Sequence, residues 1–354
     1  VAPPTVAPPT VAPPIGEPGT PATPESPIKT PPASGVAVPT YRAEVPLFAA
    51  LPAELRQADL AMLGNLHRRI GDETAANDQA TRNAWARAIY ADLDIRQGGI
   101  ADARSEGHVS GLQAGTDLLA SGNWRAGVYV GYLDGGADVS GNARGITARV
   151  GNNDLQSRYL GGYATWMEAG GFYADTVLQA GSHRYSVRPD LNPKASGKGS
   201  SLVASLEAGK ALALADRWTL EPQAQLAYQK SSFDDVLIAG AGVRQDADSG
   251  WIGRLGVRIK GDFATGAGRL QPYARVNLYR ASSGTDVATF IGPAAATRIA
   301  SASGYSAAEL AGGATLALNE ALSLYGEIGH VFSIGGAAKV ESSVQGSVGV
   351  KVRW

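Results

Sequence analysis

The sequence predicts an all-β membrane protein, a twelve-stranded antiparallel outer-membrane β-barrel with an N-terminal α-helix in its lumen. Two observations support this fold class. Apolar and polar side chains alternate along many segments of residues 82–354, as they do in strands that have one apolar and one polar face. Short turns and long loops alternate between these segments, which is the plan of an outer-membrane barrel.

The composition argues against several other classes of protein. Lys and Arg number 31 against 32 Asp and Glu, so no excess of positive charge indicates nucleic-acid binding. Without cysteine there is no disulfide, thiolate or Cys metal site. The 4 His lack metal-ligand spacing, and we find no phosphate-binding loop and no GxSxG elbow, so we expect no metal, no cofactor and no enzyme of these kinds. No apolar run reaches the about 18 residues of a transmembrane helix.

Residues 1–40 are predicted to be a linker. They begin with VAPPTVAPPTVAPP and stay rich in proline. Proline fixes φ and donates no backbone hydrogen bond, so this segment is expected to be disordered or polyproline II. The chain starts inside the repeat without Met or a signal peptide, which indicates a fragment of a longer polypeptide. The linker would then join something upstream to the domain downstream.

Residues 41–81 are predicted to hold a junction and the lumen helix. Pro52 suits a first helical position, Gly71 suits a C-terminal cap, and Ala, Leu, Arg and Glu dominate between them. The helix at 52–70 would be about 29 Å long, close to the hydrocarbon thickness of a bilayer. Its polar residues leave no continuous apolar face, so we expect it to lie in a polar environment.

Residues 82–354 are predicted to form the barrel. In the segment at 217–232, for example, Trp218 and Leu226 share one face while Glu221 lies on the other. The predicted strands are 82–96, 107–119, 122–134, 156–168, 171–185, 198–213, 217–232, 248–260, 269–282, 304–318, 321–332 and 341–354. Long loops are expected at 135–155, 186–197, 233–247 and 283–303.

The apolar faces are expected to contact lipid. The polar faces are dense in Arg, Gln and Glu, as a wet lumen allows, and the apolar faces are rich in Ala, Gly and Val, which would pack a soluble core thinly. Aromatic residues lie at strand ends on the apolar faces, as in an interfacial girdle. They are Trp124, Tyr132, Trp218, Tyr228, Trp251 and Trp354. A soluble sandwich or jelly roll, which would also alternate, is the alternative fold.

The strand number gives the direction of the helix. An even barrel has both ends on the side of the short turns, which is periplasmic. The helix directly precedes the first strand, so a helix in the lumen would run from the periplasmic end to the cell exterior. Twelve strands leave room for one helix, because eight strands just enclose their own side chains. A helix packed beneath the barrel as a plug is the alternative.

Charged side chains on the polar faces are the candidate lumen residues. We expect the acids to pair with the lumen arginines. The candidates are Glu207, Glu221, Arg254, Arg258, Arg275 and Glu327.

Several segments together resemble the C-terminal translocator of monomeric autotransporters, especially the pertactin-like group. They are YRAEVPLFAALP, LGNLHRRIGD, GGYATW, SLEAGK, LEPQAQL and the terminal VRW, and the resemblance covers roughly residues 40–354. It implies a monomeric barrel that exports its own upstream passenger and anchors it on the cell surface by type V secretion. It also implies outer-membrane lipid and the barrel assembly machinery as partners. The passenger could be an adhesin, a protease or a toxin.

The last strand is expected to carry the family's assembly signal. Val350, Val352 and Trp354 share the apolar face, and the alternation runs to the final residue. The resemblance implies that the assembly machinery reads the terminal aromatic residue. We expect this strand to pair with the first strand and to place Trp354 at the periplasmic rim, where an indole keeps its N–H in water.

Some members of this family cut themselves in the lumen helix, where an Asn cyclises onto its own peptide carbon. In those members two adjacent Asn precede the Leu, whereas this chain has Gly64, Asn65 and Leu66. Gly64 therefore disfavours cleavage, and Asn65 is expected to be an ordinary polar helix residue. A self-cleaving enzyme, a porin or channel, and a soluble β-rich binding module are the alternative functions.

Overall fold

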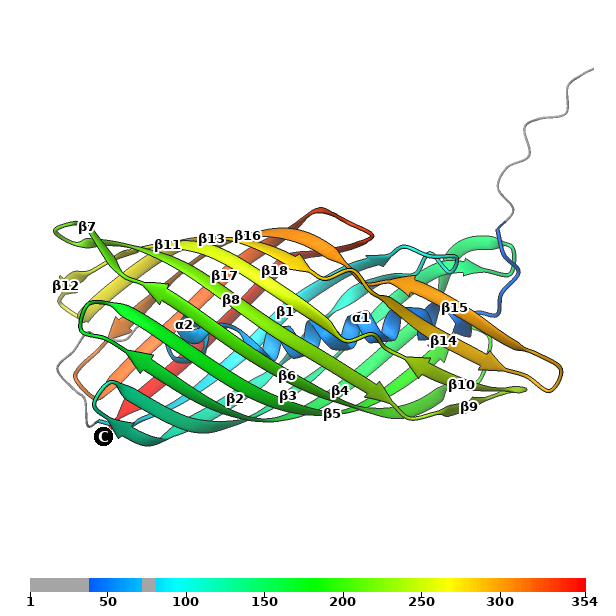
Figure 1. Cartoon of the computed structure of the whole chain (residues 1–354), viewed down its shortest axis with the longest axis horizontal. Helices are drawn as coiled ribbons and strands as arrows, with labels where there is room; N and C mark the ends of the chain where they lie inside the picture. The colour runs from blue at the N-terminus through cyan, green and yellow to red at the C-terminus, as the bar shows by residue number, and fades with distance from the viewer. Residues whose placement is uncertain (1–37, 72–80) are drawn as a thin grey trace, which may run out of the picture. The chain divides into compact units, whose positions relative to one another are not determined.

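A closed barrel of twelve antiparallel strands forms most of the chain (Figure 1). The computed structural model describes residues 38–71 and 81–354, so the linker predicted at 1–40 lies outside the described residues except for its last three. The barrel strands are β1 (Asn83–Gln97), β2 (Arg104–Ser121), β3 (Trp124–Ala143), β4 (Ile146–Met167), β5 (Phe172–Pro189), β6 (Ala195–Lys210), β8 (Trp218–Phe233), β11 (Gly250–Gly261), β13 (Gly268–Ala281), β16 (Tyr305–Ala317), β17 (Leu322–Gly336) and β18 (Ala338–Arg353). Each predicted strand corresponds to one of these, which confirms the fold class.

The barrel closes where its first and last strands meet. β18 pairs with β1 in a register that sets Arg353 opposite Asn83, and two backbone hydrogen bonds of 3.1 Å join Arg82 to Trp354. The pairing of β8 with β11 completes the ring. Each barrel strand therefore has a neighbour on both sides, and no open edge faces the lipid.

The strands are longer than predicted on the side of the long loops. β3 continues to Ala143 and β4 starts at Ile146, where a loop was expected at 135–155. At these outer ends the apolar residues Val139, Val150 and Leu155 lie on the inner face and are buried, while polar residues face outward. The apolar residues therefore change face along the strand, and no single alternation runs through it although the backbone pairing continues. The loops predicted at 233–247 and 283–303 are wrong for the same reason. They contain β9 (Val236–Ile238), β10 (Ala241–Asp246), β14 (Thr285–Ile291) and β15 (Ala296–Ala302), which form a separate four-stranded sheet.

The opposite end of the barrel has short connections. Two small strands, β7 (Leu212–Ala215) and β12 (Phe263–Thr265), extend the hairpins that begin β8 and β13. In Figure 1 these turns lie at the left, together with the C-terminus, and the four-stranded sheet lies at the right. This contrast is the one expected between the periplasmic and external ends of an outer-membrane barrel.

The helix lies in the lumen, as predicted, but its bounds differ from the predicted 52–70. α1 (Glu44–Leu63) begins well before Pro52, and α2 (Leu66–Ile70) follows a break at Gly64 and Asn65. The 20 residues of α1 correspond to about 30 Å. Neither described helix is long and apolar enough to cross a membrane.

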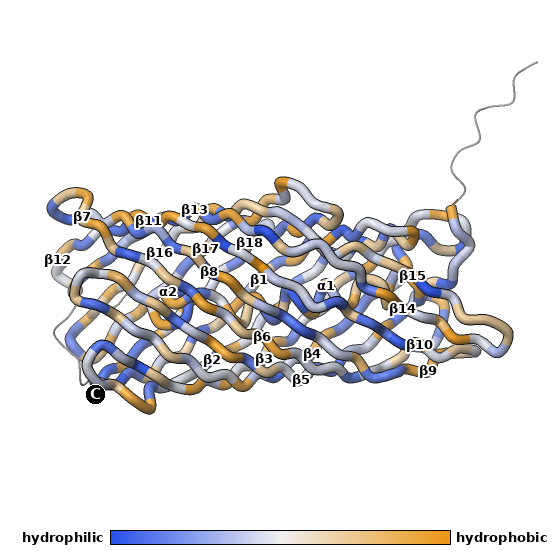
Figure 2. Tube along the Cα trace, viewed as in Figure 1, coloured by the Kyte–Doolittle hydropathy of each residue, from blue (hydrophilic) through white to orange (hydrophobic). Residues whose placement is uncertain are grey.

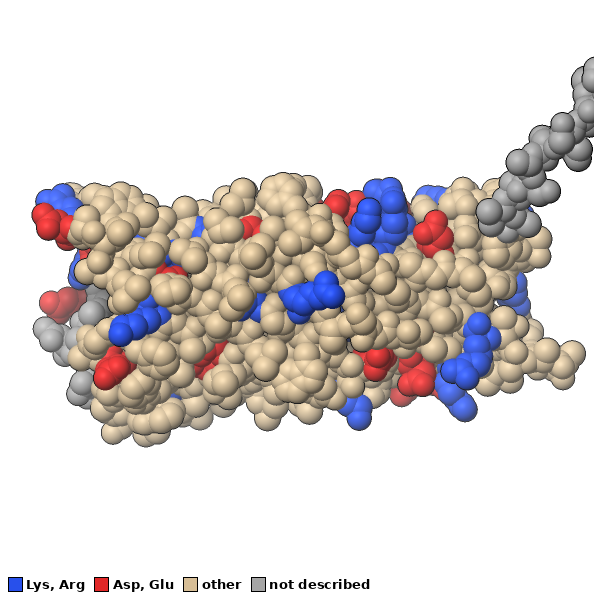
Figure 3. All heavy atoms as spheres, turned by 45° about the horizontal axis from the view of Figure 1, so that its top comes forward, with Lys and Arg blue, Asp and Glu red and all other residues tan. Residues whose placement is uncertain are grey.

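The two faces of the barrel wall differ sharply. The girdle residues Trp124, Trp218, Trp251 and Trp354 point outward and are between 40% and 59% exposed. Inward-facing polar residues such as Arg258 are buried. Orange and blue segments accordingly alternate along the strands in Figure 2. Charged side chains are scattered over the face shown in Figure 3, with a basic group near its middle, and large uncharged areas lie between them, which suits contact with lipid.

Candidate functional site

The first half of α1 is apolar and fills the outer part of the lumen. Leu47, Leu51 and Leu55 are 0% exposed. The Phe48 ring packs edge-on against Phe290 of β14, with 6.0 Å between the ring centroids. The expectation of a helix that is polar nearly all round is therefore wrong for this half. The predicted start at Pro52 had left the apolar segment EVPLFAAL outside the helix.

Proline inside α1 is accommodated by side chains from outside the helix. Pro52 has no N–H, so it cannot donate to the Phe48 carbonyl one turn earlier. Gln245 of β10 donates to that carbonyl instead, at 2.6 Å. Asn153 of β4 donates to the neighbouring Leu47 carbonyl at 3.0 Å. Side chains around the lumen therefore satisfy backbone groups of the helix near its proline.

The acids of α1 are buried but hydrogen-bonded to the wall. Glu54 accepts from Ser105 of β2 at 2.6 Å and from Asn153 of β4 at 3.0 Å. Asp59 accepts from Ser201 of β6 at 3.0 Å. Because an unpartnered buried polar group is costly, these bonds fix how far the helix is inserted and how it is rotated.

The chain leaves the lumen at the end where the long hairpins lie. The Tyr41 carbonyl accepts from the backbone of Arg144, in the β3–β4 turn, at 2.8 Å. Arg42 donates to the Ala239 carbonyl at 2.6 Å and to Glu44 at 2.6 Å. Burial raises the pKa of the Glu44 carboxyl, but hydrogen bonds from Arg42, from the Glu44 backbone and from Asn192 together outweigh it and lower that pKa. The start of α1 is thus held among the outer hairpins.

The break between the helices depends on glycine and on an arginine from the wall. Gly64 adopts φ 59° and ψ −152°, a region that residues with a Cβ rarely enter. Arg87 of β1 donates to the Met62 carbonyl at 2.8 Å and to the Arg68 carbonyl at 3.2 Å. Gln225 of β8 donates to the Gly64 carbonyl at 3.2 Å. The barrel wall therefore caps the C-terminal end of α1.

Three consecutive basic residues of α2, the basic turn His67, Arg68 and Arg69, reach different parts of the wall. His67 lies 2.7 Å from Glu221 of β8. Arg68 lies 2.8 Å from Glu327 of β17. Both carboxylate oxygens of Asp175 on β5 accept from Arg69 at 2.8 Å. Because the three acids belong to separate strands, α2 is fixed from several sides near the end of the barrel with short turns.

The structure brings all six candidate lumen residues to the inner face, where each acid has an arginine nearby. Arg254 lies 3.2 Å from Glu207, and Arg258 lies 3.9 Å from Glu221. Arg275 lies 2.6 Å from Glu327. The backbone N–H of Leu66 also donates to Glu207 at 3.2 Å. The wall charges thus pair with one another and with α2, an arrangement that stabilises a plugged lumen.

Sequence reasoning missed several lumen residues that hold the helix. Asp175 pairs with Arg69, and Glu309 lies 3.1 Å from Arg275. Both lie in predicted strands, at positions whose side chains point into the lumen. Taking every second residue along the polar face of each strand could therefore have found them. Arg87 has the same parity on β1. Nothing in the sequence indicated that Gln245 would donate to the helix backbone, because its segment was predicted to be a loop.

Asn65 caps α2 instead of lying within a continuous helix. It has an extended backbone, and its side-chain oxygen accepts from the Arg68 backbone at 2.8 Å, as an N-cap residue does. Cyclisation would require the side-chain nitrogen to reach the Asn65 carbonyl carbon, whereas the cap bond holds the side chain toward the helix. Within residues 38–71 and 81–354, no three His, Asp or Glu side chains are grouped to hold a metal ion.

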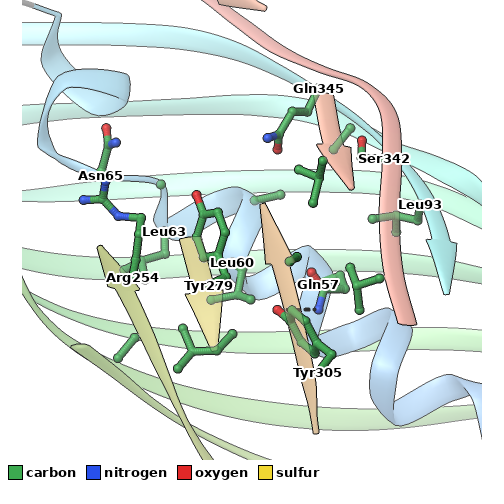
Figure 4. A pocket seen from close by; sticks show the side chains of 18 of the residues that line it. Gln57, Leu60, Leu63, Asn65, Leu93, Arg254, Tyr279, Tyr305, Ser342 and Gln345 are labelled. Carbon is green, nitrogen blue, oxygen red and sulfur yellow. Dashed lines mark hydrogen bonds between the residues drawn. The ribbon is translucent and has the colours of Figure 1, made fainter. Parts of the chain in front are cut away.

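The helix does not fill the lumen. α1 packs mainly against β1 to β5, and a cavity of about 100 Å³ remains on the side of β11, β13 and β16. Figure 4 shows Tyr279, Tyr305 and Gln345 on the wall of this cavity and Gln57 on the helix. Gln57 donates to the Tyr305 hydroxyl at 3.2 Å. This bond links α1 to the wall of the cavity.

A closed barrel with an apolar outer face, a charged inner face and a helix in its lumen defines an outer-membrane β-barrel that contains a lumen helix. Comparison with known protein families then identifies which class of outer-membrane barrel it is. The family "Autotransporter beta-domain" matches residues 84–329, so the chain belongs to the autotransporter β-domain family. It is a translocator domain of type V secretion and lies in the outer membrane. Domains of this family are transport units and not enzymes.

Individual relatives agree with this assignment. The chain is 32% identical over 277 residues to the pertactin autotransporter of Bordetella bronchiseptica, which covers 73% of this chain and 28% of pertactin. It is 30% identical over 353 residues to the "Adhesin BmaC autotransporter" of Brucella suis, covering 89% of this chain and 10% of that protein. The chain thus spans less than a third of the length of these relatives.

A solved translocator has the same fold. The domain of the autotransporter NalP from Neisseria meningitidis superposes with a TM-score of 0.66 at 15% identity, covering 86% of this chain and all of that one. At this identity the likeness concerns the fold alone.

Proposed function

We propose that this translocator exports a passenger joined upstream of it and holds that passenger on the cell surface. The observation that supports this function is the path of the chain. From β1, at the end with short turns, it runs through α2 and α1 along the lumen and leaves among the outer hairpins at Tyr41. Residues 1–40 would serve as the tether, residues 41–81 as the junction and lumen helix, and residues 82–354 as the membrane anchor.

The experiment is a surface-display assay. An epitope and a small reporter domain are fused upstream of Val1, and the fusion is produced with a signal peptide in a Gram-negative host. We expect antibody to label intact cells and added protease to release the reporter, while the folded barrel stays in the outer membrane. A reporter that stays in the periplasm beside a correctly folded barrel would show that the chain does not export what precedes it.

We propose that the helix remains in the lumen after export and closes it. The apolar half of α1 fits the outer lumen, and the basic turn is fixed to three sides of the inner end. A porin would have no use for these contacts, because they obstruct its channel. Only the cavity beside α1 favours a residual channel.

We further propose two partners, the lipid of the outer membrane and the barrel assembly machinery. The outward apolar residues support the first. Val350, Val352 and Trp354 support the second. Trp354 is 59% exposed, so its indole contributes little to packing within the described chain. A side chain that the barrel does not need for its own packing is free to be recognised by another protein. We also propose that the monomer is the functional unit.

We propose that the bond after Asn65 stays intact. Asn65 is engaged as the cap of α2, and Gly64 occupies the position where the self-cleaving members carry the reacting Asn. The passenger would then remain attached through the helix, unless it is cut elsewhere.

A further inference from the structure

Three cations lie close together on the outside of the barrel. They are Arg158 of β4, Arg184 of β5 and Lys198 of β6, named here the outer basic cluster, and all three are exposed. Arg184 lies directly opposite Lys198 in the β5–β6 register. Arg158 lies opposite Ser182, which places it diagonally beside Arg184. Residues in these relations on one face of a sheet are within reach of each other.

The outer basic cluster lies at the edge of the apolar belt. The outward-facing residues of β5 from Phe172 to Ser182 are all uncharged, and Arg184 is the next one. Ten steps of about 3.3 Å on a strand tilted by about 40° give a height of about 25 Å, which is the height of the lipid-facing band of such barrels. On β6 the uncharged outward residues lie between Lys210 and Lys198. The cluster therefore lies where the outer leaflet has its headgroups.

The barrel itself does not explain this charge. Two cations near the cluster have acidic partners: Arg149 lies 2.8 Å from Asp138 and Arg188 lies 2.7 Å from Asp154. For the part of the chain that the structure describes, no salt bridge joins the cluster to an acid. Like charges directly opposite each other destabilise a sheet. An anion from outside the chain would remove this repulsion.

The surroundings of the cluster fit a phosphate with acyl chains. Arg184 and Lys198 border a hollow of about 790 Å³, together with the hydroxyls of Ser186 and Ser196. Two carboxylates also line it, but both have partners: Asp154 lies 2.7 Å from Arg188, and Asp134 accepts from the Tyr132 hydroxyl at 3.2 Å. Guanidinium and ammonium groups both bind phosphate oxygens well, and hydroxyls add further hydrogen bonds. On the periplasmic side of the cluster lie the exposed Leu160, Leu178 and Leu202, against which acyl chains can pack; their side chains are 62%, 56% and 46% exposed.

We propose that the outer basic cluster binds the phosphate of a phosphorylated lipid headgroup in the outer leaflet. The leucines on the membrane side of the cluster favour a lipid over free phosphate, because free phosphate gains nothing from an apolar surface. Such a site would fix the height and rotation of the barrel in the membrane, since basic residues near an anionic leaflet hold a protein to it.

The test compares binding of bisphosphorylated lipid A to three proteins refolded in phosphatidylcholine vesicles. They are the unaltered chain, the variant R158Q/R184Q/K198Q, and the matched control R104Q/R149Q/R244Q, whose cations have acidic partners and lie outside the hollow. We expect the cluster variant to bind lipid A about tenfold to a hundredfold more weakly and the control to bind as the unaltered chain does. Added salt should weaken binding by the unaltered chain.

Three results would overturn the proposal. They are unchanged affinity in the cluster variant, equal loss in the control, and equally tight binding of dephosphorylated lipid A. Inorganic phosphate at the same concentration should not displace the lipid; displacement would indicate a site for a free anion. Heat-modifiable gel mobility checks that each variant is folded. If the triple variant fails to fold, Arg184→Gln alone breaks the opposed pair and is compared with Arg149→Gln, which lies outside the hollow.

Discussion

At the scale of single residues, the lumen helix depends on side chains of the barrel for part of its backbone hydrogen bonding. The clearest case is Pro52, which sequence rules placed at the start of a helix and which lies inside α1. Its missing N–H would leave the Phe48 carbonyl without a partner in a buried environment. Gln245 supplies that partner from β10. The proline is therefore compatible with the helix only in the presence of the outer sheet.

A double-mutant cycle tests this dependence. Gln245→Ala should lower the free energy of unfolding by about 1–3 kcal/mol, because the Phe48 carbonyl stays buried without a donor. In the Pro52→Ala background, residue 52 regains an N–H that can bond Phe48, so the same change should cost less by at least about 0.5 kcal/mol. Urea unfolding in lipid vesicles measures both. Equal costs in the two backgrounds would refute the link between these residues.

Gly64 permits a second prediction, about the family's self-cleavage motif. Gly64→Asn restores the adjacent Asn pair but places a Cβ at φ 59° and ψ −152°, 3.1 Å from both terminal nitrogens of Arg87. We expect a loss of about 1–3 kcal/mol in stability and no cleavage after residue 64 or 65, as read by intact mass. The control is Gly266→Asn in an open turn, where a Cβ meets nothing within 4 Å.

A product that begins at residue 65 or 66 in the Gly64→Asn protein would contradict this prediction. It would mean that the surrounding acids suffice for cyclisation once the second Asn is present. The same mass measurement on the unaltered chain tests whether Asn65 itself reacts.

At the scale of elements, the sequence predicted best where one face meets lipid and the other meets the lumen. All twelve barrel strands were found from period two, because that environment imposes strict alternation. The outer ends of β3 and β4 were missed, since their apolar residues lie on the inner face there and not on the outer one. The start of α1 was missed because Pro52 was given more weight than the apolar run before it. The alternation of side chains along the strands placed Arg254, Arg258 and Arg275 on the inner face. It could not show that α2 would contact the acids that pair with these arginines.

The basic turn of α2 leads to a prediction about closure. Replacing His67, Arg68 and Arg69 by Leu, Met and Met leaves Glu221, Glu327 and Asp175 without these partners. Breaking a buried ion pair by removing one member costs about 3–5 kcal/mol, so α2 should detach from the wall. We expect single-channel recordings in planar bilayers to show longer and larger openings than the unaltered chain does. Arg104→Met, which removes an exposed cation on the outer surface, is the control and should have no effect.

Deletion of residues 46–70 gives the upper limit of conductance for that experiment. If the deletion opens the barrel while the triple variant stays closed, the apolar half of α1 is sufficient for closure and the basic turn is not required. If the unaltered chain already conducts as much as the deletion, the helix does not plug the lumen and the porin function gains support.

At the scale of the whole molecule, the fold depends on joining its two ends. The last strand completes the ring by pairing with the first, down to the backbone bonds between Arg82 and Trp354. These bonds involve only the main chain, and the indole itself is 59% exposed. Closure of the barrel and the proposed recognition of its C-terminus would therefore use different atoms of the same residue, which makes them experimentally separable.

Trp354→Ala separates them, because it keeps the backbone pairing and removes the indole. Stability of the barrel refolded in detergent should change by no more than about 0.5 kcal/mol, as for other exposed substitutions. Insertion in cells should fall severalfold if the assembly machinery reads the terminal aromatic residue, and surface display of a fused epitope measures this. Trp124→Ala is the matched control, since Trp124 is a 53% exposed indole near the same rim that does not lie at the terminus. Normal display from Trp354→Ala, or an equal loss from Trp124→Ala, would show that the terminal indole acts only as one member of the aromatic girdle.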